Sequence, residues 1–173
     1  MRILVLAFTH AVVFSFGIGL GIYLLPILIA PAGPGVEAVR SVAASALFTG
    51  EFHRNLQDSD PLHWGEGMLY VRSDVIAFEG ELAPGPDYRL YLSPAFVETE
   101  SGFLAMRDEM VEVGPVRTFE NFAVPVPSTI DPAAYRAAIV WCEAFGQFIT
   151  AAAYQGVASR VRGTSDGEPP ADG

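Results

Sequence analysis

The sequence predicts an all-β protein, a single β-sandwich or barrel of about seven to eight short strands, preceded by one N-terminal transmembrane helix. Two observations predict this fold. Residues 3–30 contain no Asp, Glu, Lys or Arg, which is typical of a membrane span. From residue 47 onward, short runs rich in aromatic and β-branched side chains alternate with Gly, Pro and Asp, which is typical of short strands joined by tight turns.

The apolar N-terminal segment predicts a helix near residues 3–25, which is longer than the roughly 20 residues that cross a bilayer core. We expect Pro26 to end or kink this helix. A cleaved signal peptide is the alternative, because residues 30–32 resemble a small-residue cleavage site. The apolar core of a signal peptide, however, runs only about 7–15 residues.

The charges that flank this helix predict its orientation. Arg2 is the only charged side chain before it, whereas Glu37 and Arg40 follow it. The positive-inside rule therefore predicts a single-pass protein with a cytoplasmic N-terminus and a folded domain in the periplasm or cell exterior. Gly17 and Gly21 form a pair of small residues four positions apart, a spacing that lets two membrane helices pack closely as a homodimer.

The rest of the chain divides by composition. We expect an anchor at residues 1–30, a linker with a short helix at 31–46, a β domain at 47–155 and a disordered tail at 156–173. Within the domain, residues 98–110 predict a helix because their apolar side chains share one face. The expected strands cover residues 46–54, 65–71, 75–81, 88–92, 118–125, 137–142 and 145–154.

Charge and missing motifs exclude several function classes. The formal net charge is −10, and all ten basic residues are arginine, which is typical of a bacterial chain of GC-rich coding. An acidic domain of this kind is not expected to follow a nucleic-acid backbone. The sequence lacks the motifs of serine hydrolases, zinc proteases, P-loop enzymes and dithiol oxidoreductases. We therefore expect no ordinary hydrolytic or transfer chemistry.

Five spaced elements of the β domain follow one another in a recognisable order. They are Gly50 with Phe52, His63 with Gly67, Gly85-Pro86-Asp87 with Tyr91-Leu92-Ser93, Phe122 with Pro125, and Trp141-Cys142 with Phe145. This pattern resembles the DM-thirteen domain, which occurs beside DOMON domains in animal Skeletor-type proteins and in bacterial membrane-anchored proteins. The resemblance implies a β-rich extracytoplasmic domain with a proposed electron-transfer role that rests on its single cysteine. Relative to animal members, residues 98–110 are an insertion.

Cys142 is the only cysteine of the chain, so it forms no internal disulfide. One interpretation is a thiolate that binds a metal or another cofactor, or that changes redox state. The other is a buried packing residue, because free cysteine is among the most buried residue types. The adjacent Glu143 is expected to raise the pKa of the thiol. The sequence names no cofactor and no metal.

His63 is the candidate partner of Cys142, because cysteine and histidine together form zinc and copper sites. The alternative is an imidazole that bonds a nearby backbone group or carboxylate and shapes the turn at Asp60. Trp141, Asp87 and Tyr91 are the expected supporting residues. Trp141 either flanks a ligand or fills core volume, and Asp87 lies in a Gly-Pro-Asp turn.

Two functions from different classes follow from these residues. The first is a membrane-anchored redox or cofactor-binding module centred on Cys142, with a redox or protein partner outside the cytoplasm. The second is a non-catalytic interaction module in which Cys142 only packs the core. A thiol buried without polar neighbours favours the second function. Contact between Cys142 and His63, within about 4 Å, favours the first.

Overall fold

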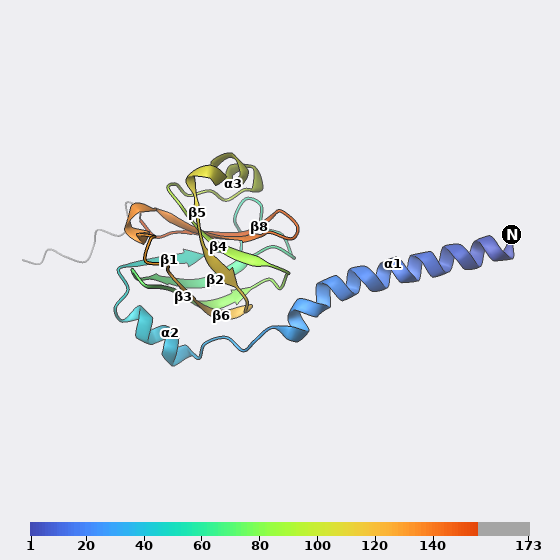
Figure 1. Cartoon of the computed structure of the whole chain (residues 1–173), viewed down its shortest axis with the longest axis horizontal. Helices are drawn as coiled ribbons and strands as arrows, with labels where there is room; N and C mark the ends of the chain where they lie inside the picture. The colour runs from blue at the N-terminus through green and yellow to red at the C-terminus, as the bar shows by residue number, and fades with distance from the viewer. Residues whose placement is uncertain (156–173) are drawn as a thin grey trace, which may run out of the picture.

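The computed structural model describes residues 1–155, and the tail predicted at 156–173 lies outside the described residues. A long helix, α1 (Arg2–Ile29), extends away from the folded domain (Figure 1). Within residues 1–155 it is the one helix long and apolar enough to span a membrane. The helix continues through Pro26 to Ile29, so this proline does not end it, and the alternative of a kink stays a prediction. Proline removes only one backbone donor, and membrane helices tolerate that loss.

The domain is a β-sandwich of two four-stranded antiparallel sheets, which confirms the predicted fold class. The first sheet has the order β1-β2-β3-β6 and the second has the order β5-β4-β7-β8. The strands are β1 (Phe48–Phe52), β2 (Gly65–Val71), β3 (Val75–Leu82), β4 (Tyr88–Ser93), β5 (Val111–Val116), β6 (Glu120–Pro125), β7 (Ala137–Cys142) and β8 (Gln147–Ala153).

Short helices cover the outer faces of the sandwich. A linker leads from α1 to α2 (Val36–Ala43), which packs against β3 and β6 through the buried Val39. The predicted helix at residues 98–110 forms α3 (Glu100–Met106), followed by the 3₁₀ turn η1 (Arg107–Glu109). α3 and α2 lie on opposite sides of the domain (Figure 1). A second 3₁₀ turn, η2 (Pro132–Ala134), precedes β7.

β5 is the strand that the sequence interpretation missed. Its sequence contains Gly114 and Pro115, two residues that normally mark a turn rather than a strand. Proline is tolerated here because β5 is an edge strand and pairs only with β4. The ladder between the two strands is also irregular, with a register shift between Leu90 and Tyr91.

β7 has apolar neighbours on both faces, and all six of its residues are buried. Because side chains alternate along a strand, Val140 and Cys142 point into the core between the sheets. Ile139 and Trp141 point to the other face, where they join a second cluster with Phe103 of α3. A strand covered on both sides loses the alternation of apolar and polar residues, which explains the continuous apolar run at 137–142.

Candidate functional site

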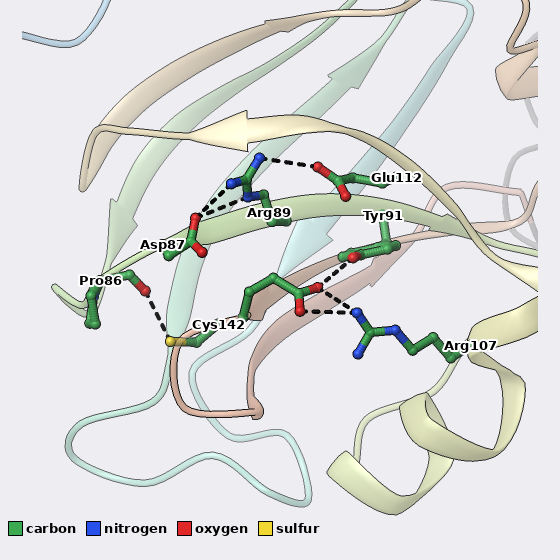
Figure 2. A network of polar contacts seen from close by, with 8 residues as sticks. Pro86, Asp87, Arg89, Tyr91, Arg107, Glu112 and Cys142 are labelled. Carbon is green, nitrogen blue, oxygen red and sulfur yellow. Dashed lines mark hydrogen bonds and ion pairs between the residues drawn. The ribbon is translucent and has the colours of Figure 1, made fainter.

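Cys142 lies at the end of β7, where the strand enters the hairpin that leads to β8. Only 2 % of the residue is exposed. Its Sγ atom donates a hydrogen bond to the carbonyl oxygen of Pro86 at 3.0 Å, so the thiol is buried but has a polar partner (Figure 2). Pro86 belongs to the connection between β3 and β4, which brings the Gly-Pro-Asp motif to the thiol.

Two further hydrogen bonds hold the β3–β4 connection in place, one from the first residue of β4 and one from the residue that follows β7. The hydroxyl of Tyr88 donates to the carbonyl of Ala83 at 2.9 Å. The backbone amide of Glu143 donates to the carbonyl of Asp87 at 3.0 Å. Asp87 has φ +51°, a left-handed conformation that Asp adopts more readily than most residues. The turn therefore delivers the Pro86 carbonyl to Cys142 in a defined position.

A chain of charges begins at the same turn. The carboxylate of Asp87 accepts an ion pair from Arg89 at 2.9 Å, and Arg89 also pairs with Glu112 of β5 at 3.3 Å (Figure 2). All three side chains are partly exposed. Exposed ion pairs stabilise a fold by at most about 1 kcal/mol each. We therefore infer that these ion pairs mainly orient the side chain of Asp87.

Glu143 connects the strand that carries the thiol to η1, which follows α3. The hydroxyl of Tyr91 donates a hydrogen bond to Glu143, and the guanidinium of Arg107 contacts both carboxylate oxygens at 2.9 and 3.0 Å. Burial alone would raise the pKa of Glu143, but the hydrogen bonds from Tyr91 and Arg107 outweigh it and lower this pKa. The carboxylate is therefore ionised at neutral pH, directly after Cys142.

Trp141 lies on the far face of the second sheet from the thiol. Its ring stacks on Phe103 with a centroid distance of 4.0 Å and an interplanar angle of 9°, and Tyr91 meets Phe103 edge to face at 5.2 Å. The indole Nε1 of Trp141 is buried without a hydrogen-bond partner among residues 1–155. Trp141 thus fills the space under α3, and it does not flank the Cys142 sulfur.

The electrostatic surroundings keep the thiol protonated. Burial raises the pKa of Cys142 above its ordinary value, and the carboxylates of Asp87 and Glu143 raise it further. The backbone amides of Ala144 and Phe145 lower the pKa but do not reverse the shift. Cys142 is therefore a protonated, weakly nucleophilic thiol in the closed structure, because the thiolate is the reactive form.

His63 lies in the β1–β2 connection and forms a local pair with Asp60. Its Nδ1 atom lies 2.8 Å from Asp60 Oδ2, and the other carboxylate oxygen of Asp60 accepts the amides of Leu62 and His63. The side chains of His63 and Cys142 thus form hydrogen bonds with different partners, Asp60 and Pro86. Within residues 1–155, no group of three or more His, Cys, Asp or Glu side chains is placed to hold a metal ion.

Three of the five expected site residues, Cys142, Asp87 and Tyr91, are thus connected through Glu143. Cys142 precedes Glu143, Asp87 accepts its amide, and Tyr91 bonds its carboxylate. Sequence reasoning missed Glu143 and Arg107 as site residues. A carboxylate directly after six apolar strand residues was one signal for Glu143, since a charge at that point requires a partner. Nothing in the sequence indicated Arg107 as that partner.

Fold and site together define a small antiparallel β-sandwich domain, preceded by an apolar helix, with a buried thiol at one end. Residues 55–154 match the family model described as electron transfer DM13. The chain therefore belongs to the DM13 family, which confirms the resemblance seen in the sequence. No curated protein matches the chain, and no solved structure matches it.

Proposed function

We propose that this protein is a membrane-anchored redox module in which Cys142 is the reactive group. The family match over residues 55–154 carries the proposal, because the family is described by electron transfer. The apolar helix α1 is compatible with a membrane anchor. The flanking charges, Arg2 at the start of α1 and Glu37 after its end, favour a domain in the periplasm or cell exterior.

The polar surroundings of Cys142 support a chemical role. A thiol that served only as packing would need no acceptor, yet Sγ donates to Pro86 and lies between two carboxylate-bearing residues, Asp87 and Glu143. Attack by the Cys142 sulfur on a disulfide would require the β3–β4 connection to move, since Pro86 covers the thiol. In this proposal the connection opens transiently in the folded chain, so that the sulfur can exchange with a small disulfide or with a disulfide of a partner.

His63 is proposed as a second contact for a metal or redox partner. Asp60 occupies Nδ1 and leaves Nε2 as the nitrogen available to a ligand. A carboxylate on one nitrogen is the usual arrangement behind a metal-binding histidine, because it fixes the tautomer and the ring orientation. The imidazole is 25 % exposed, so a partner can reach it without unfolding the turn.

The alternative function is a non-catalytic interaction module, and the burial of Cys142 favours it. A residue that is 2 % exposed, with a raised thiol pKa, meets no partner in the closed structure. Under this alternative, the hydrogen bond from Cys142 to Pro86 only fixes the turn between β3 and β4. Pairing of two α1 helices through Gly17 and Gly21 stays a proposal for either function, testable by crosslinking in detergent micelles.

Thiol reactivity and metal content decide between the two functions. The full chain in detergent is treated with a maleimide before and after unfolding, and its metal content and visible spectrum are recorded beside those of Cys142→Ser. Oxidation of Cys142 by a mild disulfide-forming reagent in the folded chain, or bound metal that is lost in Cys142→Ser, supports the redox module. A thiol that reacts only after unfolding, in a colourless and metal-free protein, contradicts it.

A further inference from the structure

The linker between α1 and α2 runs against the first sheet and is not a free tether. A side chain at Gly33 would place its Cβ 2.5 Å from the carbonyl oxygen of Asn121, so only glycine fits this close approach. The amide of Asn121 also donates to the carbonyl of Pro34 at 3.4 Å, and its oxygen accepts the amide of Gly80 at 3.0 Å. Asn121 thus connects the linker to β3 and β6.

This contact leaves little freedom between anchor and domain. α1 contains 28 residues, so it is about 42 Å long, close to the thickness of a bilayer with both headgroup layers. If α1 spans the membrane, its end at Ile29 lies at the headgroup surface. Gly33 follows four residues later, and this segment reaches at most about 14 Å. The start of β6 is therefore held close to the bilayer.

A cleft of about 350 Å³ lies between the end of α1 and the domain. Pro26, Ile29 and Pro31 line it from the anchor side, and Arg117 and Phe119 are among the residues that line it from the domain side. Arg117 is exposed and has no ion pair among residues 1–155. A free guanidinium fits a phosphate through two parallel hydrogen bonds.

The same end of the sandwich carries the thiol. Tyr88 and Asp87 also line the cleft. In the second sheet, Tyr88 pairs with Val116 on one side and with Cys142 on the other. Val116, Tyr88 and Cys142 are therefore neighbours across three adjacent strands at the end of the sheet that borders the cleft. Cys142 lies about two strand spacings, or roughly 10 Å, from Val116.

We propose that this end of the sandwich, defined by Tyr88, Val116, Arg117 and Cys142, faces the bilayer, with Arg117 bound to a phospholipid phosphate. The inference rests on the proposed function only in that α1 is a membrane span. Since the chain as a whole has a net charge of −10, anionic lipids repel most of the domain. The fixed linker selects the end that approaches the membrane, and Arg117 is an exposed arginine at that end, without an ion pair in the described part of the chain.

Fluorophores at the start of β6 and three residues beyond its end test the orientation. Glu120→Cys and Ser128→Cys, each in a Cys142→Ser background, are labelled and reconstituted as full chains in phosphatidylcholine vesicles with a minority of phosphatidylglycerol and a nitroxide headgroup quencher. We expect stronger quenching at position 120 than at position 128, because the six residues of β6 alone span about 20 Å. Equal quenching, or stronger quenching at 128, overturns the proposal.

Two pairs of substitutions test its parts. Gly33→Val should abolish the difference between the two labels, whereas Gly35→Val should preserve it, because nothing lies within 4 Å of a side chain at Gly35. A difference that survives Gly33→Val overturns the fixed linker. Arg117→Gln should lower quenching at position 120, and unchanged quenching overturns the phosphate contact.

The experiments distinguish a failure of the proposed membrane orientation from a failure of the proposed redox function. A chain that does not insert into vesicles contradicts both the membrane anchor and the orientation. A chain that inserts and shows the expected quenching, but whose Cys142 is inert, retains the orientation and contradicts the redox module alone.

Discussion

The Sγ atom of Cys142 donates a hydrogen bond to the carbonyl oxygen of Pro86 at 3.0 Å, and the two residues are 56 positions apart in the chain. This contact joins the end of β7 to the turn before β4, both of which carry motifs of the family pattern. The turn therefore covers the sulfur of a residue that is only 2 % exposed.

Cys142 is expected to make the protein less stable at alkaline pH. Burial raises the pKa of the folded-state thiol, so the stabilisation is present below the unfolded pKa of about 8.5 and is lost as the pH rises above it. In urea unfolding, the free energy of unfolding of the unmodified chain should decline from neutral to alkaline pH. The decline should be smaller in Cys142→Ser, which lacks the thiol. Parallel declines in the two proteins would contradict the raised pKa.

Glu143 is expected to stabilise the fold in the opposite pH range. Its folded pKa is lowered, so its contribution is complete above the unfolded value of about 4.3 and is lost as the pH falls through the folded value. Glu143→Gln should lower the free energy of unfolding at neutral pH by about 1–2 kcal/mol. The loss should shrink as the pH falls below the unfolded value of about 4.3.

Glu109→Gln is the control for this prediction, because Glu109 is exposed and forms no ion pair among residues 1–155. It should change stability little at either pH. A Glu143→Gln deficit of the same size at both pH values would show that packing, and not the charge contact with Arg107, sets the effect.

Phe103 is expected to hold the insertion on the second sheet. It is fully buried between Trp141 and Tyr91, whereas its neighbour Leu104 is 52 % exposed. Phe103→Ala should lower the free energy of unfolding by about 3–5 kcal/mol and shift the Trp141 fluorescence to longer wavelength. Leu104→Ala, the matched control on the same helix, should leave both nearly unchanged. Equal effects of the two substitutions would contradict the packing described for α3.

His63 is expected to contribute to metal binding, and His53 provides the matched control. His63 has Nδ1 bonded to Asp60 and presents Nε2, whereas His53 lies exposed beside Glu51 at 3.8 Å. In a zinc titration of the full chain, His63→Ala and Asp60→Asn should weaken binding by about 10-fold or more, and His53→Ala should bind as the unmodified chain does. The same affinity in all four proteins would exclude His63 as a ligand.

The predicted fold agrees with the structure where local chemistry determines it. Turn residues separate the strands, so seven of the eight strands could be located from composition and breaks alone. β5 could not, because Gly114 and Pro115 are permitted there only by its place at the edge of a sheet. That place depends on the pairing with β4, which the local sequence does not encode.

The candidate site was predictable in its residues and not in its contacts. Cys142 and Asp87 stood out by type and motif, yet their separation in the chain hid the turn that joins them. The contact between Arg107 and Glu143 spans 36 positions and depends on how the insertion folds over the sheet. Trp141 lay next to the cysteine in sequence, but alternation along β7 sends it to the opposite face.

The central claim is that Cys142 is the redox group of this DM13 domain, and equilibration with glutathione tests it most directly. The folded chain in detergent is incubated with oxidised glutathione beside Cys142→Ser, whose hydroxyl preserves a donor to Pro86. In this step the thiolate of Cys142 attacks the glutathione disulfide, forms one mixed disulfide and releases one reduced glutathione. We predict that the folded chain gains the mass of one glutathione, that an excess of reduced glutathione removes it, and that the variant gains none. A folded chain that gains no mass would contradict the claim and favour a domain that binds a partner without redox chemistry.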